Sequence, residues 1–262
     1  MTTNTDVVFT SEPLAGILQI HLNRPQQLNA LSEQVLTHLS SLFQIAKQDS
    51  AIKAILLTGE GKAFCAGADI KQLASLDGLT GLTFAKLGQA TFRALETLGK
   101  PSLAAIQGFA FGGGCELAMS ATMRMAAENT LFGQPEVNLG VIPGFGGTQR
   151  LARLIGKGRA LDLCLTGRRF SAEDALQWGL ISEVTPEAEL TSRALATLKK
   201  LVTFPPVALQ SIMTVIDQGY DLPLVEALEL EALHFALCCT TADKTEGVEA
   251  FLAKRPPVFE GN

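Results

Sequence analysis

Apolar residues in the first two thirds of the chain follow two alternating patterns. Short apolar runs bounded by turn residues are typical of strands, and segments whose apolar residues recur every three or four positions are typical of amphipathic helices. Strands are predicted at residues 7–10, 17–22, 54–58 and 102–107. Helices are predicted from the Ser32 cap to Ala46 and from Phe84 to Leu98. Strands that alternate with helices indicate an α/β fold with a partly parallel sheet.

The pattern changes near Thr148, after which almost every segment has helical periodicity. The elements predicted beyond this point are a short strand and three long helices, at residues 180–184, from Pro205-Pro206, at residues 224–237 and at residues 242–254. We therefore expect an α/β core over residues 1–200 and a helical region over residues 201–262.

The helical region carries an apolar stripe formed by Leu224, Leu228, Leu233 and Leu237. A single subunit whose α/β core is already complete has little room to bury such a stripe. Soluble proteins commonly cover an apolar face with a second copy of the same chain. The stripe therefore predicts a homo-oligomer.

Composition and charge exclude several classes of protein. With 47% hydrophobic and 18% charged residues, the chain can bury a large core and is not intrinsically disordered. A net charge of −5, one Trp and one Tyr disfavour nucleic-acid binding, which needs clustered cations and aromatic platforms. The uncharged stretch Pro101–Cys115 is too short and too rich in glycine to cross a membrane. The first residues lack the basic start of a signal peptide, so we expect a cytoplasmic protein without a membrane span.

Cysteine and histidine residues do not have the spacing of a metal site. None of the five cysteines belongs to a C-x-x-C pair, and His21, His38 and His234 are far apart in the chain. We interpret the cysteines as reduced thiols of the core and His21 as a solvated position on a strand. Without a catalytic histidine, a Ser-His-Asp or Cys-His mechanism is disfavoured.

Glycine clusters lie at two predicted strand-to-helix junctions. The strand at 102–107 leads into Gly112-Gly113-Gly114, and the strand at 54–58 leads through a loop to a helix start at Ala68-Asp69. Neither cluster has the spacing of a nucleotide-binding loop, and ordinary turns are the simplest explanation. However, the first amides of a helix lack internal partners, and glycine lets a ligand approach the backbone closely. Two such junctions can together form an oxyanion hole.

Two glutamates stand in apolar surroundings next to glycine clusters. Glu116 follows three glycines and is flanked by Cys115 and Leu117, and Glu136 follows Gln134-Pro135. Apolar surroundings disfavour the charged form of a carboxyl and raise its pKa toward the range useful for proton transfer. The alternative is that both are ordinary helix N-terminal residues that interact with the helix dipole.

Several long motifs of the chain resemble those of the crotonase, or enoyl-CoA hydratase/isomerase, superfamily. In order, they are Arg24-Pro25 with Asn29-Ala30-Leu31, Ala63 to Lys71, Gly112 to Ala118, Phe132 to Glu136 and Ile142 to Leu151. The resemblance covers about residues 7–259. It implies a crotonase-like α/β spiral of ββα turns with a C-terminal helical trimerisation region, assembled as a homotrimer or as a homohexamer, a dimer of trimers.

The resemblance also implies an acyl-CoA site. The amides of Ala68 and Gly113 correspond to the oxyanion hole, and the hydratases hold water between two glutamates, here Glu116 and Glu136. By the same resemblance, Glu116 deprotonates the water and Glu136 serves the proton on the α carbon. Neither a metal nor another cofactor is expected, because coenzyme A is part of the substrate.

Residues implied to contact the substrate or its coenzyme A are Ala66, Asp69, Ile70, Lys71, Gly144 and Lys254. Relatives often carry Lys after Arg24-Pro25, whereas this chain has Gln26-Gln27. Lys71 or Lys254 is a substitute cation for the phosphates. Lys254 belongs to a C-terminal segment that in some relatives touches the coenzyme A of a neighbouring subunit, and an ordinary basic helix end is the alternative.

The resemblance predicts reversible addition of water across the 2,3 double bond of 2-enoyl-CoA thioesters. An isomerase that converts 3-enoyl-CoA to 2-enoyl-CoA is the nearest alternative, but it needs mainly one base. A non-catalytic or RNA-binding member and a thioester hydrolase are further alternatives. The segment from Leu73 to Phe84 is expected to form a mobile wall of the acyl pocket.

Overall fold

A computed structural model describes residues 6–261, and the sequence-based interpretation of the first residues as free of a signal peptide falls mostly outside this range. The strands form a six-stranded sheet, in the order β1-β2-β3-β4-β6-β9, and a three-stranded sheet, in the order β5-β7-β8. Their bounds are β1 Val8–Leu14, β2 Ile17–Leu22, β3 Ala54–Gly59, β4 Ser102–Ile106, β5 Phe109–Phe111, β6 Met123–Ala127, β7 Leu131–Gly133, β8 Arg169–Ser171 and β9 Glu183–Thr185.

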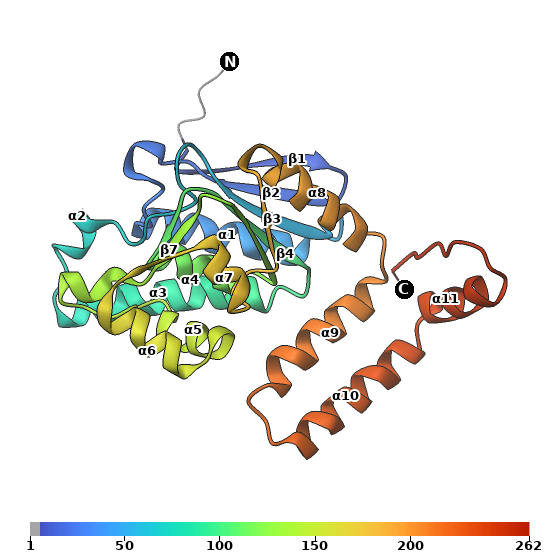
Figure 1. Cartoon of the computed structure of the whole chain (residues 1–262). Coiled ribbons are helices and arrows are strands. Elements are labelled where there is room, and N and C mark those ends of the chain that lie inside the picture. The colour runs from blue at the N-terminus through green and yellow to red at the C-terminus, as the bar shows by residue number, and fades with distance from the viewer. Residues whose placement is uncertain (1–5, 262) are drawn as a thin grey trace.

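The α-helices cover the sheets and continue beyond them (Figure 1). They are α1 Glu33–Gln48, α2 Ile70–Leu73, α3 Gly78–Glu96, α4 Gly113–Ser120, α5 Gly147–Ile155, α6 Lys157–Thr166, α7 Ala172–Gln177, α8 Leu190–Leu201, α9 Pro206–Gly219, α10 Leu224–Cys239 and α11 Ala242–Leu252. Short 3-10 helices span Pro25–Gln27, Pro135–Leu139 and Glu187–Glu189. Within residues 6–261, no helix is both long and apolar enough to cross a membrane.

Successive turns of the chain place one strand in each sheet, which produces a spiral. β4 enters the large sheet, β5 enters the small sheet and α4 follows; β6 and β7 then repeat the step. β4 pairs with β6 and β5 pairs with β7, both in parallel. The expected spiral of ββα turns is therefore confirmed. Trimerisation is a separate question, which a single chain does not answer.

The core lies on both faces of the large sheet. β3 and β4 are buried along their whole length, as expected for strands covered on both sides. Helix α1 packs the predicted apolar face against one side, and the Ser32 hydroxyl accepts a hydrogen bond from the Val35 amide at its N-terminus. Helix α8 covers the other side with Leu190, Ala194 and Leu198. The predicted elements of the N-terminal half are thus found close to their predicted bounds.

Some elements differ from the sequence-based prediction. Four short strands were not predicted: the three-residue β5, β7 and β8 and the five-residue β6. A strand this short contains too few residues to show a clear alternation of apolar and polar positions. Helix α3 begins at Gly78 rather than at Phe84, because the Asp77 and Thr80 side chains form a capping box there. β9 begins three residues later than predicted.

Two predictions about single side chains are wrong. His21 does not face solvent: β1 and β3 flank its strand, and its ring stacks on Phe9 with centroids 4.2 Å apart. Its ring nitrogens lie 2.8 Å from Glu60 Oε1 and 2.8 Å from Ser11 Oγ. Among the cysteines, Cys65 and Cys115 are buried core thiols as predicted. Cys239 is exposed, because it lies on α10, where no residue is buried.

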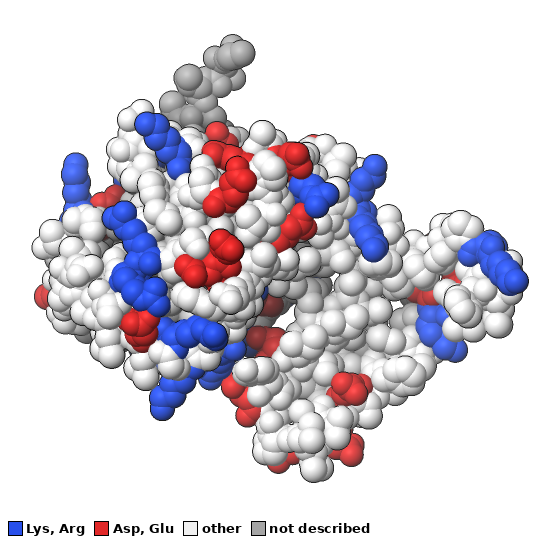
Figure 2. Space-filling model, viewed as in Figure 1, with Lys and Arg blue, Asp and Glu red and all other residues white. Residues whose placement is uncertain are grey.

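Helices α9, α10 and α11 form an arm that extends from the α/β body (Figure 1). α9 and α10 pack side by side, and the only buried residues on the three helices are Ser211, Asp243 and Ala250. In the view of Figure 2 the surface of the arm is mostly uncharged. The apolar stripe noted in the sequence, including Leu224 and Leu233, is exposed on this arm.

Candidate active site

An apolar cavity of about 740 Å³ lies between the α2–α3 region and the segment that links the second 3-10 helix to α5. Its polar groups are few, and they include the carboxyls of Glu116 and Glu136. A mostly apolar cavity with a few converging polar groups is the usual form of a small-molecule site. Its walls contain Ala68, Ile70, Leu73, Ala74, Leu76, Asp77, Gly81, Phe84, Ala85, Gly113, Glu116, Glu136, Leu139, Val141, Ile142, Gly144 and Phe145.

The backbone brings the amides of Ala68 and Gly113 to this cavity. Leu31 and Ala68 form an isolated parallel β-bridge, which fixes the backbone at Ala68. The preceding residue, Gly67, lies close to Gly113, since a Cβ atom at Gly67 would be 3.8 Å from the Gly113 nitrogen. Gly113 is the first residue of α4, so its amide has no partner within the helix. Within residues 6–261, neither amide donates a hydrogen bond. Two unpaired, adjacent amides at the cavity wall can stabilise a developing oxyanion.

Arg24 and Asn29 hold the loop that carries Ala68. The Arg24 guanidinium donates to the Ala30 carbonyl and to Asp69 Oδ2, at 2.6 and 2.8 Å. The Asn29 side chain is 1% exposed; its Oδ1 accepts from the Arg24 amide, and its Nδ2 donates to the Ala63 carbonyl. The motif Arg24-Pro25 with Asn29-Ala30-Leu31 therefore stabilises the loop that carries Ala68.

Glu116 projects from the first turn of α4 and is 1% exposed. Its Oε1 accepts hydrogen bonds from the amides of Phe145, at 2.8 Å, and Gly147, at 2.5 Å. Burial and, to a smaller extent, the neighbouring Glu136 raise the pKa of Glu116 to about 8, although hydrogen bonds from the Gly147 and Phe145 amides oppose this shift. Since both amides bind Oε1, Oε2 is left for a water molecule or a substrate.

Glu136 approaches the same cavity from the 3-10 helix Pro135–Leu139. The Gln134 amide, which is fully buried, donates to both of its carboxyl oxygens at 3.2 Å. A Cβ atom at Gly112 would overlap Glu136 Oε1, so only glycine lets the carboxyl lie against this backbone. Burial raises the pKa of Glu136 to about 7.

The two carboxyls can therefore exchange protons near neutral pH. Each has a pKa raised by burial, and each charge disfavours ionisation of its neighbour. One carboxylate and one carboxylic acid, facing one cavity, can accept a proton from one reacting atom and deliver a proton to another. The alternative interpretation, that both residues merely favour a helix dipole, does not account for their burial.

The predicted site residues fall into two groups. Ala68, Ile70, Gly113, Glu116, Glu136 and Gly144 line the cavity, and so does part of the segment from Leu73 to Phe84. Ala66, Asp69, Lys71 and Lys254 are not in its walls. Asp69 caps α2 and pairs with Arg24, and Lys71 is exposed nearby. Lys254 is exposed just beyond α11 on the arm, so on one chain it is remote from the cavity (Figure 1).

Two residues at the site were not predicted. Gln134 belongs to the motif Phe132 to Glu136, and its amide is fully buried in the structure. The sequence signal that could have identified it is its position two residues before the candidate acid Glu136. Arg150 lies near the end of the glycine-rich motif Ile142 to Leu151, and its ion pair is with Glu96 on a helix far away in the sequence. Within the described chain, no group of three or more His, Cys, Asp or Glu side chains is arranged to hold a metal ion.

Comparison with known proteins shows the family to which the chain belongs. The family Enoyl-CoA hydratase/isomerase matches residues 12–262. The chain is 42% identical over 251 residues to the short-chain-enoyl-CoA hydratase of Clostridium acetobutylicum, covering 95% of each chain. It is 39% identical to the crotonyl-CoA hydratase of Syntrophomonas wolfei, covering 97% of each.

A solved structure, the enoyl-CoA hydratase from Bacillus anthracis, superposes with a TM-score of 0.94 at 36% sequence identity. The superposition covers 98% of this chain and 100% of that one. Fold and sequence agree over nearly the whole length. The chain belongs to the enoyl-CoA hydratase/isomerase family.

Proposed function

We propose that this protein adds water reversibly across the 2,3 double bond of a 2-enoyl-CoA thioester to give a 3-hydroxyacyl-CoA. The observation that carries the proposal is the pair of carboxyls at one cavity, the buried Glu116 and the partly buried Glu136, beside the unpaired amides of Ala68 and Gly113. Two similar proteins, named short-chain-enoyl-CoA hydratase and crotonyl-CoA hydratase, support the same reaction.

In the proposed mechanism the thioester oxygen accepts hydrogen bonds from the Ala68 and Gly113 amides. Glu116 takes a proton from water while the water oxygen bonds to the β carbon, and the π electrons move onto the thioester oxygen as an enolate. Glu136 then gives a proton to the α carbon as the enolate collapses. Proton transfer from Glu116 to Glu136, through water, restores the starting state.

No metal or redox cofactor takes part in this proposal. The thioester makes the β carbon electrophilic and stabilises the enolate, and backbone amides supply the electrostatic stabilisation. The apolar walls, which include Leu73, Phe84 and Ile142, suit an alkyl chain. Lys71 directly follows Ile70 of the cavity wall and is the proposed contact for a phosphate of coenzyme A.

Substitution of each carboxyl by its isosteric amide tests the proposal. We expect Glu116→Gln and Glu136→Gln each to lower the rate of crotonyl-CoA hydration by about 10²–10⁴-fold, because an acid or a base is lost. The rate is followed by loss of the absorbance of the conjugated thioester. Glu128→Gln, an exposed carboxyl on the turn after β6, is the control and should hydrate at the wild-type rate.

Isomerisation of 3-enoyl-CoA is the competing outcome. It needs one carboxylate that shuttles a proton between the α and γ carbons. If Glu116→Gln isomerises a 3-enoyl-CoA at the wild-type rate while Glu136→Gln is inactive, the protein is an isomerase. A wild-type protein inert toward every 2-enoyl-CoA offered would also end the hydratase proposal.

We further propose that the protein assembles as a homotrimer or as a homohexamer built from trimers. The arm supports this, because its helices expose Leu224, Val225, Leu233 and Phe235, each more than 60% accessible. A monomeric soluble protein rarely leaves so much contiguous apolar surface in water. Light scattering at micromolar concentration should give a mass three or six times that of the subunit, and a mass of 27.8 kDa would contradict assembly.

A further inference from the structure

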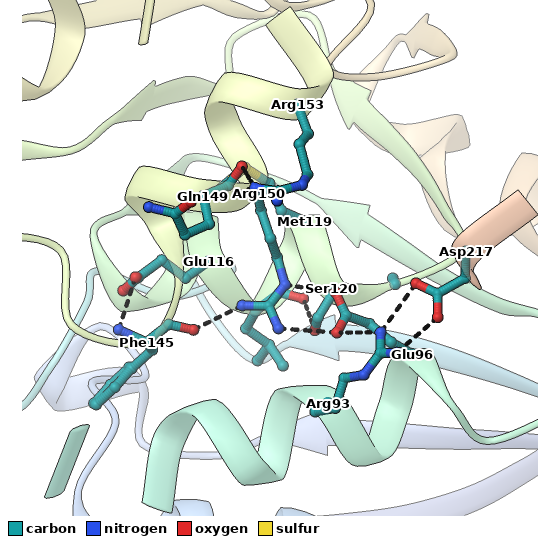
Figure 3. A network of polar contacts seen from close by, with 12 residues as sticks. Arg93, Glu96, Glu116, Met119, Ser120, Phe145, Gln149, Arg150, Arg153 and Asp217 are labelled. Atoms are coloured by element: carbon teal, nitrogen blue, oxygen red, sulfur yellow. Dashed lines mark hydrogen bonds and ion pairs between the residues drawn. The ribbon is translucent and has the colours of Figure 1, made fainter. Parts of the chain in front are cut away.

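Arg150 on α5 and Glu96 on α3 form a largely buried ion pair behind the cavity (Figure 3). The guanidinium donates from Nε to Glu96 Oε1 at 2.5 Å and from Nη2 to Glu96 Oε2 at 2.9 Å. The two side chains are only 16% and 18% exposed. Such a two-point contact fixes the plane of the guanidinium as well as its position.

The third donor of Arg150 points at the loop that holds Glu116. Its Nη1 donates to the Phe145 carbonyl at 2.7 Å, and the Phe145 amide donates to Glu116 Oε1 (Figure 3). A Cβ atom at Gly146 would overlap Arg150 Nη1, so the glycine opens the path by which the guanidinium reaches this carbonyl. A single residue, Phe145, therefore links Arg150 to Glu116: its carbonyl binds the guanidinium and its amide binds the carboxyl that we propose as the base.

The Phe145 ring is also held, so the loop has little freedom to turn. The ring makes edge-on contacts with Phe84 and Phe92, at centroid distances of 5.1 and 5.7 Å. A Cβ atom at Gly88 would overlap the ring, so α3 accommodates it only because this position is glycine. With the ring and the carbonyl both fixed, the amides of Phe145 and Gly147 are directed at Glu116.

We infer that Arg150, oriented by Glu96, is a positioning residue that keeps Glu116 in the geometry and ionisation state needed to deprotonate water. Arg150 is not in the cavity wall and does not act on the substrate itself. The inference rests on the proposed function, because it assigns Arg150 a role through Glu116. It also gives a role to the arginine that follows the glycines of this motif.

Loss of Arg150 has a definite electrostatic consequence. The positive charge and the two amides all favour the ionised form of Glu116, against burial and the neighbouring Glu136. Without the guanidinium, the buried Phe145 carbonyl loses its partner and the loop amides are less well directed. The pKa of Glu116 then rises above its value in the wild type, and a smaller fraction is ionised at neutral pH.

Arg93, at the solvent-exposed end of the same network, makes a weaker contact with Glu96. Arg93 makes two hydrogen bonds to Asp217 on α9, at 2.9 and 2.8 Å, and a longer one of 3.4 Å to Glu96. Arg93 is half exposed, so its ion pairs are largely screened by water. We expect the contribution of Arg93 to the orientation of Glu96 to be small.

The test compares Arg150→Met with Arg153→Met, an exposed arginine on the same helix that pairs with Asp221. For Arg150→Met we expect kcat for crotonyl-CoA hydration at pH 7 to fall about 10–10²-fold, with KM changed less than about threefold. The acid limb of the pH profile should shift to higher pH, so that part of the loss is recovered near pH 9. Arg153→Met should keep the wild-type rate and profile.

Two further variants separate positioning from folding. Arg150→Lys keeps the charge without the planar fork and should give an intermediate rate. Glu96→Gln keeps the shape of its side chain and should shift the acid limb in the same direction as Arg150→Met. If Arg150→Met does not fold, this variant carries the test. A loss of rate that is uniform across pH, or no loss, would overturn the inference.

An infrared titration makes the inference independent of activity. The C=O stretch of protonated Glu116, assigned by its absence in Glu116→Gln, is followed from pH 5 to pH 10 in protein without substrate. In Arg150→Met its midpoint should move to higher pH than in the wild type, and an unmoved midpoint would overturn the inference. If the midpoint moves but the wild type hydrates no enoyl-CoA, the proposed function has failed and the positioning of Glu116 stands.

Discussion

The α/β body and the C-terminal arm differ in how they use apolar residues. In the body, the large side chains Phe43, Phe64, Phe92 and Phe132 are less than 2% exposed. On the arm, Phe235 and Phe251 are 71% and 83% exposed. The body is therefore a complete core in one chain, whereas the arm has apolar faces that one chain does not cover.

The cavity that forms the candidate site is lined by residues of the body, and the burial of side chains there explains its chemistry. Buried surroundings raise the pKa of both carboxyls and leave room for an apolar substrate. The arm provides a surface without such groups, and its contact with the body includes the Arg93–Asp217 ion pair. The candidate site thus depends on packing within the subunit, whereas the arm leaves apolar residues exposed on a single chain.

Removal of a core ring should give the largest effect. Phe43→Ala in α1 leaves a cavity under the sheet, and we expect the free energy of unfolding to fall by about 3–5 kcal/mol. Ile45→Ala, on the same helix but 56% exposed, should cost less than about 1 kcal/mol. Urea unfolding of both variants measures the difference. Equal losses would show that the body is not packed as described.

A methyl group at the site should cost activity without unfolding the body. At Gly147 a Cβ atom would lie 2.9 Å from Glu116 Oε1 and 2.9 Å from the side-chain amide of Gln134. We expect Gly147→Ala to lower kcat/KM for 2-enoyl-CoA about 10²-fold, because the base is displaced. Gly158→Ala in α6 is the control, since its Cβ would meet nothing within 4 Å. Comparable turnover of the two variants would contradict the site geometry.

The raised carboxyl pKa values predict that stability falls as pH rises through neutrality. Between about pH 4.5 and pH 7–8 the unfolded chain has lost these protons and the folded chain retains them, so raising the pH favours unfolding. The expected slope near pH 6–7 is about 2 kcal/mol per pH unit, because each fully retained proton contributes about 1.4 kcal/mol per pH unit. Glu116→Gln should have a shallower slope in urea unfolding at several pH values. An identical slope would mean that Glu116 is ionised when folded.

Truncation of an exposed ring on the arm should have the smallest effect on the subunit. We expect Phe235→Ala to change the stability of one subunit by less than about 0.5 kcal/mol. The same change should weaken assembly, so that sedimentation velocity detects monomers at higher protein concentration than for the wild type. A large loss of subunit stability with unchanged assembly would mean that the ring packs within its own chain.

Most of the secondary structure could be predicted because its signals are local. Ser32 caps α1 as predicted, and α9, α10 and α11 begin close to the positions that Pro206, Leu224 and Ala242 indicate. The strands of the small sheet could not be predicted, because Phe109–Phe111 and Leu131–Gly133 are too short to show a period. Pairing with each other, rather than their own composition, makes them strands.

The candidate site was predicted only in part. Glu116, Glu136, Ala68 and Gly113 were identified because they stand in motifs that resemble a known family. Gln134 and Arg150 were not, because their roles depend on contacts with Glu136 and with Glu96 on another helix. His21 was misinterpreted because an alternating strand pattern does not show which face a neighbouring strand covers.

By itself the sequence determined the class of fold, the order of most helices and of the longer strands β1 to β4, and the two candidate carboxyls, since these follow from local periodicity, capping residues and motifs. Tertiary structure decided the rest: that Glu116 and Glu136 face one cavity, that Ala68 and Gly113 line the same cavity, and that Arg150 reaches Phe145 past Gly146. The physical reason is that burial and long-range hydrogen bonds, which raise the carboxyl pKa values and direct the amides, exist only after distant segments have packed together.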